Sequence, residues 1–252
     1  MVRIGLLGCG NVGKIIATHQ DGFTVEALFD RLPDHAEELA RICGAPAFSD
    51  FQEFISQDFD ICVEAASVLA VREYAPKVLE NRKNILILSV GALSDSYFRK
   101  VLLQKARDHN KKIHIPSGAI MGLDNLKVGQ ISRIESVLLR TTKSPESLGL
   151  SVSSKTLVFR GKANECVKQF PKNINVSVAL ALAADHDVDV ELWADPDVDR
   201  NIHDIQVTGE FGEANIRIVN HPSPDNPATS YLAALSVLSL LKNLDSPLVI
   251  GS

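Results

Sequence analysis

Aromatic residues are scarce in this sequence. Phe, Trp and Tyr together make up 6% of its 252 residues, and there is a single Trp. Surfaces that stack nucleic-acid bases need exposed aromatic rings, and surfaces that hold the phosphate backbone need clustered Lys and Arg. The chain has 26 basic against 31 acidic residues and a formal net charge of −5. Both properties exclude nucleic acid as the expected partner.

Long hydrophobic runs and closely spaced cysteine pairs are also missing. No apolar stretch reaches the roughly 20 residues that cross a bilayer, and the first residues enter a strand pattern without the features of a signal peptide. The cysteines form no C-x-x-C pair, and each stands in an apolar segment that suits a reduced, buried thiol. We therefore expect a cytoplasmic chain that binds neither membrane nor metal. The four cysteines are Cys9, Cys43, Cys62 and Cys166.

The hydrophobic residues, 45% of the chain, fall into alternating strand and helix patterns in the first half. Such alternation predicts a parallel, doubly wound sheet of the α/β class. Pro33 and Gly44 are placed to begin and end one helix, Asp50 and Glu53 are spaced like a capping box, and Ser94 is the expected cap of a later helix. The predicted strands are 2–7, 24–29, 47–48, 60–65, 84–90 and 112–116, and the predicted helices 12–19, 33–43, 68–81 and 94–109, with a further helix after Asp50.

The second half changes to strands in succession. Strands are predicted over 135–142, 156–159, 189–193, 203–208 and 215–219, with a hairpin turn at 210–213 and one clear helix over 175–184. This pattern is typical of a smaller α+β domain with a mostly antiparallel sheet. Leucine recurs every three residues from Leu232 to Leu244, which predicts a final helix over 227–244 with an apolar stripe, capped by Asn226.

A glycine-rich loop joins the first predicted strand and helix. Gly8-Cys9-Gly10-Asn11-Val12-Gly13 matches G-x-G-x-x-G, and Asp30 ends the second strand about 20 residues later, as the dinucleotide fingerprint requires. In that fingerprint the glycines permit a tight turn and close approach of the backbone to a pyrophosphate at the helix N-terminus. We therefore predict a nicotinamide-dinucleotide-binding oxidoreductase. The expected cofactor contacts in the loop are Gly8, Gly10, Asn11, Val12 and Gly13.

The residue pair Asp30 and Arg31 bears on the choice of cofactor. A carboxylate at position 30 accepts hydrogen bonds from the ribose hydroxyls and repels the 2′-phosphate of NADP, so NAD is the preferred cofactor. The neighbouring guanidinium of Arg31 can hold a phosphate or stack on adenine, so NADP is expected to be tolerated. Small residues at the carboxyl ends of the other strands are further candidates, because ligands bind there in such sheets; they are Ala66, Ser67, Val90, Gly91, Ser117 and Ala119.

Two dense polar stretches, 199–204 and 220–230, mark the expected substrate side. Asn226, Thr229 and Ser230 precede the last helix, where amide groups and the helix dipole favour a carboxylate; plain capping by Asn226 explains that residue equally well. His203 and His221 both suit proton transfer near neutral pH. The residues alone leave the choice between the two histidines open.

Several longer motifs resemble the short archaeal and bacterial L-aspartate dehydrogenases over nearly the whole chain. The resemblance implies His203 as the acid–base residue and cofactor contacts at Ala119 and at an asparagine of the 173–175 segment, of which Asn173 is preferred. Position 228, often lysine in similar chains, is alanine here. The motifs are the glycine loop and the segments 63–67, 89–95, 116–120, 170–176, 194–196, 201–203 and 226–236.

The resemblance implies oxidative deamination of L-aspartate through iminoaspartate to oxaloacetate and ammonia, a link to NAD biosynthesis, and a homodimer. Because aspartate has two carboxylates, Lys143 and Ser117 join the expected substrate contacts. Related reductases, such as dihydrodipicolinate reductase and homoserine dehydrogenase, stay open as alternatives, as does a non-catalytic NAD sensor. The expected organisation is a dinucleotide-binding domain over 1–120, an α+β substrate and dimerisation domain over 121–226, and a C-terminal helix over 227–252 that packs back across both.

Overall fold

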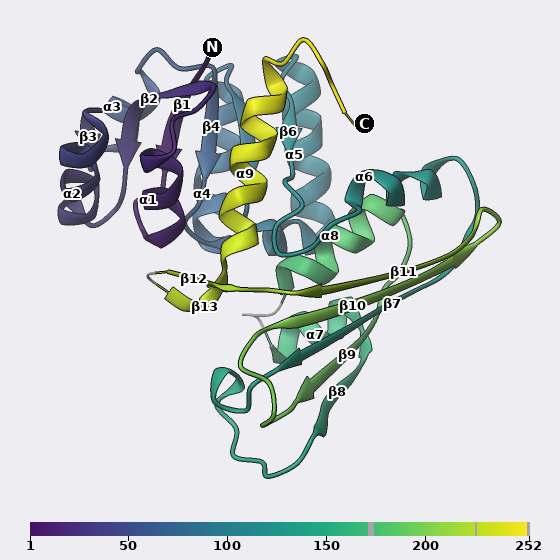
Figure 1. Cartoon of the computed structure of the whole chain (residues 1–252). Coiled ribbons are helices and arrows are strands. Elements are labelled where there is room, and N and C mark those ends of the chain that lie inside the picture. The colour runs from purple at the N-terminus through teal and green to yellow at the C-terminus, as the bar shows by residue number, and fades with distance from the viewer. Residues whose placement is uncertain (171–173, 225, 251–252) are drawn as a thin grey trace. The chain divides into compact units, whose positions relative to one another are not determined.

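The computed structural model describes residues 1–170, 174–224 and 226–250 (Figure 1). The chain forms two compact units: Met1–Pro116 together with Ala234–Ile250, and Ser117–Ala233. None of the described helices combines the length and the apolar character that crossing a bilayer requires.

The first unit contains a six-stranded sheet in the order β3-β2-β1-β4-β5-β6, with every neighbouring pair parallel. The chain runs outward from β1 in one direction through β2 and β3, then returns to the other side of β1 for β4. This reversal of strand order is the place where open α/β sheets bind ligands, outside the carboxyl ends of the strands. The strands are β1 (Val2–Leu7), β2 (Phe23–Phe29), β3 (Ala47–Phe48), β4 (Ile61–Glu64), β5 (Asn84–Ile87) and β6 (Ile113–His114).

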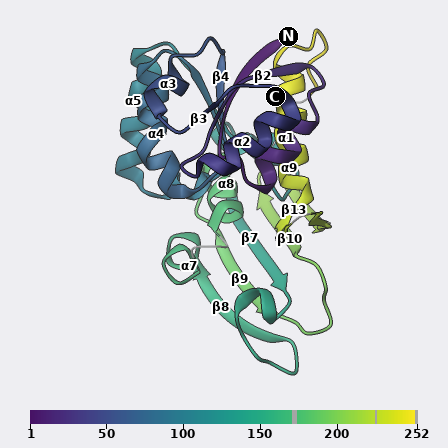
Figure 2. The ribbon, with the colours of Figure 1, turned by 90° about the vertical axis from the view of Figure 1, so that its left-hand side faces the viewer.

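Helices cover both faces of this sheet. Figure 2 shows α1, α2 and α9 on one side of the strands and α3, α4 and α5 on the other. Buried strand residues such as Leu6 and Val63 pack against Ile16 of α1 and Val237 of α9, which explains why the strands are apolar along their whole length. The helices are α1 (Asn11–Thr18), α2 (Pro33–Cys43), α3 (Phe51–Ile55), α4 (Val68–Glu80), α5 (Ser96–Asp108) and α9 (Tyr231–Leu244).

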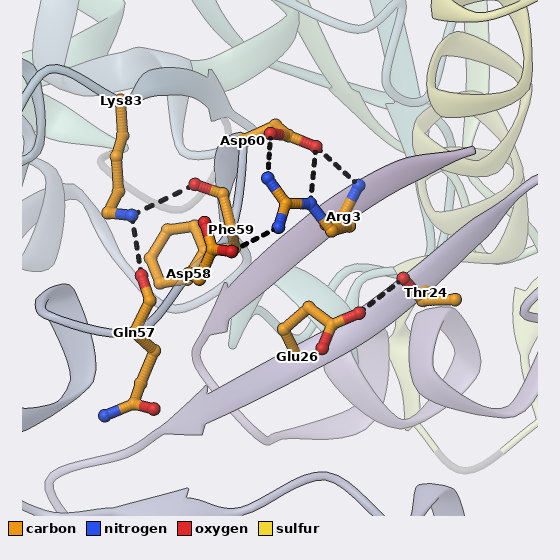
Figure 3. A network of polar contacts seen from close by, with 8 residues as sticks. All are labelled: Arg3, Thr24, Glu26, Gln57, Asp58, Phe59, Asp60 and Lys83. Carbon is orange, nitrogen blue, oxygen red and sulfur yellow. Dashed lines mark hydrogen bonds and ion pairs between the residues drawn. The ribbon is translucent and has the colours of Figure 1, made fainter.

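A polar network joins the amino ends of β1 and β4, at the edge of the sheet away from the glycine loop (Figure 3). The Arg3 guanidinium donates to both Asp58 and Asp60, with 2.8 Å between Nη2 and Asp60 Oδ1, and its hydrogen bonds lower the pKa of the Asp60 carboxyl. The Lys83 ammonium donates to the carbonyl oxygens of Gln57 and Phe59. These contacts fix the loop before β4 and therefore belong to the framework rather than to the candidate site.

The second unit contains a five-stranded sheet in the order β11-β10-β7-β9-β8 (Figure 1). Only the pair β7 and β9 is parallel, so the predicted, mostly antiparallel α+β domain is confirmed. Buried residues of the sheet, such as Leu139, Leu192 and Ile205, pack with Leu180 of α8 and Cys166 of α7 in one core. The elements are α6 (Leu123–Leu126), η2 (Lys127–Gln130), β7 (Ile134–Lys143), η3 (Glu146–Leu148), β8 (Thr156–Lys162), α7 (Ala163–Gln169), α8 (Ile174–Ala184), β9 (Asp189–Ala194), β10 (Ile202–Gly209) and β11 (Gly212–Val219).

The start of the last helix differs from the prediction. Helix α9 begins at Tyr231, and the preceding residues form β13 (Asn226–Ser230), which pairs with β12 (Pro222–Ser223). Asn226 therefore does not cap the helix. The Tyr231 amide donates to the His221 carbonyl, so a hairpin satisfies backbone groups that the prediction had assigned to a helical first turn.

Two smaller predictions are also wrong. Strand β5 ends at Ile87, and Val90–Ser94 forms a 3-10 helix, η1. Asp95 rather than Ser94 caps α5, because its carboxylate accepts from the amides of Tyr97 and Phe98, whereas the Ser94 hydroxyl donates to the Gly91 carbonyl. Helix α7 adds a second helix to the succession of strands. Its first turn is stabilised by the Glu165 carboxylate, which accepts from the Lys162 amide.

Candidate functional site

The glycine loop lies between β1 and α1, and two of its glycines are required by the fold itself. Gly8 has φ of +104°, and a Cβ atom there would lie 2.7 Å from the Ala65 carbonyl carbon. A Cβ atom on Gly13 would collide with the carbonyl oxygen of Gly8. These two positions let the loop turn sharply and let α1 pack close to the strand ends.

Gly10 is different, because the protein alone does not require a glycine there. Its backbone is extended, with φ of −76°, and a Cβ atom would meet nothing within 4 Å. Gly10 immediately precedes α1, whose first amides face outward from the helix N-terminus. A residue that leaves open space beside a helix N-terminus fits a dinucleotide, whose diphosphate must approach the backbone closely.

A pocket of about 230 Å³ opens beside this loop. Asp30 lines it, and both of its carboxylate oxygens are held: Oδ2 accepts from the Cys9 amide at 2.9 Å and Oδ1 from the Leu32 amide at 3.0 Å. The carboxylate is thereby fixed between the glycine loop and the end of β2, at the position from which an acidic residue accepts hydrogen bonds from the ribose hydroxyls in such folds. Six predicted cofactor residues gather here: Gly8, Gly10, Asp30, Arg31, Ala66 and Ser67.

Eight residues of the pocket were not predicted as cofactor contacts; three of them, Leu7, Phe29 and Ala65, lie at or next to the ends of strands. Leu69, Ala70, Glu73 and Tyr74 line it from α4, where spacings of three and four residues place side chains on one side of a helix. His35 lines it from α2, with Nδ1 3.9 Å from Asp30 Oδ2. Helical spacing after Ser67 was the available signal for the α4 residues; no local pattern marked His35.

The remaining predicted cofactor residues are not among those that line this pocket. Asn11 and Val12 are half-buried in the first turn of α1, and Val90 and Gly91 are buried in η1. Ala119 belongs to the second unit, as does Ser117. Asn173 lies outside the described residues.

In the second unit, His203 lies on β10 directly opposite Thr141 of β7. Its side chain is 5% exposed, and its Nδ1 lies 3.0 Å from the Thr141 hydroxyl oxygen. Burial, and secondly the positive charge of Lys143, lower the pKa of His203 to about 4. The imidazole is therefore neutral at physiological pH and can accept a proton.

Lys143 follows Thr141 by two residues on β7, so both side chains lie on the same face of the sheet. The side chain is half-buried, and burial lowers the pKa of its ammonium group. Within the described ranges, no carboxylate lies within 4.0 Å of this ammonium group. A desolvated cation beside a buried histidine is an arrangement that favours binding of a substrate carboxylate.

Asn220 links three of the predicted site segments and was assigned no role from the sequence. It is 4% exposed. Its side-chain amide donates to the Ala119 carbonyl at 3.0 Å and accepts from the Ser230 hydroxyl at 2.7 Å, while its backbone amide donates to the Asn201 carbonyl. Because the amide side chain donates through its nitrogen and accepts through its oxygen, Asn220 fixes these segments relative to one another.

A second pocket, of about 530 Å³, lies where these segments meet. Of the predicted substrate residues, Asn226 and Ser230 line it, whereas Thr229 is half-buried on β13 without lining it. His221, the second candidate histidine, also lines it and is exposed. Arg200 adds a cation that the sequence analysis did not single out.

Each of the two units matches a known protein family. Residues 7–116 match the family model described as the NAD-binding domain of homoserine dehydrogenase, and residues 124–244 match that described as the C-terminal domain of aspartate dehydrogenase. L-aspartate dehydrogenase of Methanospirillum hungatei is 87% identical over 252 residues, with all of both chains covered. The chain belongs to the L-aspartate dehydrogenase family.

Two more distant members of the L-aspartate dehydrogenase family agree with this assignment. The enzyme of Methanothermobacter thermautotrophicus is 44% identical over 256 residues, covering 100% of this chain and 99% of that one. The crystal structure of aspartate dehydrogenase from Thermotoga maritima matches all of both chains with a TM-score of 0.84 and 32% identity. The fold class predicted from the sequence, a dinucleotide-binding sheet domain joined to an α+β domain, is therefore confirmed, as is the use of an NAD(P) cofactor.

Proposed function

We propose that this chain catalyses the NAD(P)-dependent oxidative deamination of L-aspartate to iminoaspartate, and then to oxaloacetate and ammonia, or the reverse reaction. The observation that carries the proposal is the buried His203, held by Thr141 beside the cation Lys143, in the unit that matches the C-terminal domain of aspartate dehydrogenase. Aspartate-dependent reduction of the nicotinamide cofactor is the test.

The cofactor, when bound, supplies the acceptor for the hydride that leaves the substrate Cα. We propose that Gly8, Gly10 and the first turn of α1 hold its diphosphate and that Asp30 holds the adenine ribose. Ala66, Ser67 and Ala119 complete the expected contacts, together with Asn173. The wider assignment of 1–120 to cofactor binding and of 121–226 to substrate binding rests on the same reasoning.

His203 is the proposed proton acceptor. The substrate amine must be neutral before hydride leaves Cα, and a neutral imidazole can take its proton. Because Nδ1 is engaged with Thr141, Nε2 is the atom that exchanges protons. Once the imidazolium has released that proton to solvent, the same atom can accept a proton from the water that adds to the imine carbon.

The substrate carboxylates require cations or hydrogen-bond donors. Lys143 is the proposed cation for one of them, and Asn226, Thr229, Ser230 and Ser117 are the proposed polar contacts for the other. Leaving the Lys143 ammonium desolvated costs stability, and pairing with a substrate carboxylate recovers part of that cost on binding. If Lys143 pairs with the side-chain carboxylate, the site binds aspartate in preference to amino acids whose side chains carry no charge.

The cofactor preference follows from the charges around the adenine pocket. Asp30 and Glu73 are acidic residues of its lining, and Arg31 and His35 are basic residues of the same lining. The fixed carboxylate of Asp30 repels a 2′-phosphate, so we expect a KM for NAD at least several-fold below that for NADP. Initial rates with each cofactor at saturating aspartate measure this ratio. A lower KM for NADP than for NAD would mean that Arg31 and His35 bind the 2′-phosphate and outweigh the repulsion from Asp30.

The other readings considered from the sequence are less well supported. The match to homoserine dehydrogenase covers the cofactor-binding domain alone, whereas the second unit matches aspartate dehydrogenase. A sensor without turnover would have no use for the buried His203 beside Lys143, because a buried histidine and a desolvated cation both cost stability.

We further propose that the chain forms a homodimer through the face of the second sheet opposite its core. On that face a row of ion pairs crosses the strands: Glu191 is held by Arg140 at 2.8 Å and by Arg160 at 2.9 Å, and Arg217 pairs with Asp204. Directly beside it, paired residues on neighbouring strands form a row of four apolar side chains and one threonine, called the apolar row below. That row consists of Leu157, Trp193, Thr142, Ile202 and Val219.

An apolar row bordered by charges is typical of an interface between subunits. Leu157 and Val219 are 36% and 48% exposed at its two ends. We expect a dimer in sedimentation equilibrium, and a monomer when both residues are replaced by lysine. Ile131→Lys, at a residue 92% exposed outside the row, should leave the dimer intact. A monomeric parent chain, or a dimer that survives the double substitution, would refute the interface.

A cytoplasmic location is the remaining proposal. All four cysteines are unpaired, and burial raises the pKa of the Cys9 and Cys166 thiols to about 12 and about 11, so these two stay protonated and unreactive. Reduced thiols and an NAD(P) cofactor both suit the cytoplasm. Cell fractionation tests the location, and recovery of the chain with the membrane fraction would contradict it.

A further inference from the structure

One fully buried carboxylate in the first unit has no part in the proposed chemistry. Glu64 is the last residue of β4, next to Leu7 of β1 and Ile87 of β5 in the sheet, and it is 0% exposed. It therefore stands at the carboxyl ends of the strands, beside the reversal of strand order between β1 and β4, where these sheets bind their ligands.

The Glu64 carboxylate is held by donors from two different loops. Oε1 accepts from the Ala66 amide at 2.9 Å and from the Ser89 hydroxyl at 2.8 Å, and Oε2 accepts from the Ser89 amide at 2.9 Å. The first loop contributes Ala65, Ala66 and Ser67 to the pocket beside the glycine loop. One side chain thus joins a wall of the cofactor pocket to the loop that follows β5.

We infer that Glu64 is a positioning residue for the dinucleotide: its carboxylate fixes the backbone of the 65–67 loop against Ser89 in the conformation that receives the cofactor. This inference rests on the proposed cofactor site and adds a residue to it. Glu64 does not touch the substrate, and its effect is expected on cofactor affinity rather than on the chemical step.

Electrostatics argue against a purely structural purpose for this carboxylate. Burial raises the pKa of Glu64, even though its hydrogen bonds with Ser89, Ala66 and Ser67 act in the opposite direction. A carboxyl group whose pKa is higher in the folded chain than in the unfolded chain costs stability once it ionises, at a pH above its folded pKa. The fold therefore gains little from the ionised form of Glu64, whereas a defined loop conformation favours tight binding.

The test is the Glu64→Gln variant of the full chain, with NADH as the probe. Glutamine keeps the shape but replaces one acceptor oxygen by an NH2 group, which cannot accept from the amides of Ala66 or Ser89. We expect the dissociation constant for NADH, measured by its fluorescence, to rise at least tenfold. The midpoint of thermal unfolding without cofactor should change little, because the lost hydrogen bonds are offset by removal of a buried charge. With aspartate, KM for NAD should rise while kcat stays within a few-fold.

Two companion variants separate positioning from folding. Ser89→Ala removes one donor and keeps the amide, so its dissociation constant for NADH should fall between those of the parent and Glu64→Gln. Glu26→Gln removes a carboxylate of the same sheet whose partner is Thr24. The pair lies on β2 before its carboxyl end (Figure 3), so this variant should leave NADH binding unchanged.

Several results would overturn the inference. An unchanged dissociation constant for NADH in Glu64→Gln would show that the carboxylate does not control the conformation of the loop that binds the cofactor. A weakened affinity accompanied by a large fall in the unfolding midpoint would assign Glu64 to the framework. If the parent chain itself fails to bind NADH, the cofactor site and this inference fail together; if it binds NADH but does not oxidise aspartate, only the substrate assignment fails.

Discussion

Replacing His203 by alanine should lower kcat for aspartate oxidation by about 10²-fold or more while NADH still binds with its normal affinity. General acid–base groups contribute about 10² to 10⁴ in rate, and His203 is the buried imidazole that Thr141 orients beside Lys143. Steady-state rates and NADH fluorescence titration of the same preparation separate the two effects.

The matched control is His221→Ala. His221 is the competing histidine, and it is exposed at the edge of the second pocket, so its loss should change kcat by only a few-fold. The opposite outcome, near-normal turnover in His203→Ala with a large loss in His221→Ala, would transfer the role to His221.

The low pKa of His203 gives a second, independent readout. Because the folded pKa of about 4 lies below the ordinary value of about 6.5, the unfolded chain binds more protons between these two values. The stability contributed by the neutral imidazole is present above pH 6.5 and is lost as pH falls towards 4. His203→Gln should therefore lose less stability than the parent across this interval, as measured by thermal unfolding at each pH.

Replacing Gly10 by alanine should weaken NADH binding at least about tenfold without destabilising the protein. The Cβ atom meets nothing within 4 Å in the protein, but it would enter the space that we propose for the diphosphate at the start of α1. Loss of one hydrogen bond to a charged group costs about 1.5–3 kcal/mol, and about 1.4 kcal/mol corresponds to a tenfold change in affinity. Fluorescence titration and thermal unfolding measure the two quantities.

Gly13→Ala is the contrasting variant, because its Cβ atom would collide with the Gly8 carbonyl oxygen. It should lower the unfolding midpoint as well as the affinity for NADH. Normal NADH affinity in Gly10→Ala would mean that the cofactor does not approach the glycine loop at this residue.

Local signals were sufficient for much of the first unit. Pro33 and Gly44 predicted helix α2 with the bounds observed, Pro33–Cys43, because the fixed φ of proline and the left-handed φ of +78° at Gly44 act within one turn. The same kind of rule failed at Ser94 and Asp95, where two adjacent residues can both cap a helix. Asp95 caps the helix because its carboxylate accepts hydrogen bonds from two backbone amides.

Long-range pairing explains the larger errors. Asn226 followed by proline predicts the start of a helix. The segment instead forms a strand that pairs with β12, and no local sequence pattern predicts that pairing. Glu64 and Asn220 were given no role of their own from the sequence for a similar reason. Their hydrogen-bond partners Ser89 and Ala119 lie 25 and 101 residues away along the chain, so their importance becomes visible only when the segments are brought together.

The most direct test of the proposed function is aspartate-dependent reduction of NAD by the purified chain, followed by the absorbance of the reduced nicotinamide. We expect turnover with L-aspartate, at most weak turnover with L-homoserine or with amino acids that lack a second carboxylate, and loss of turnover in His203→Ala. Tight NADH binding without oxidation of aspartate, or a preference for homoserine, would contradict the assignment.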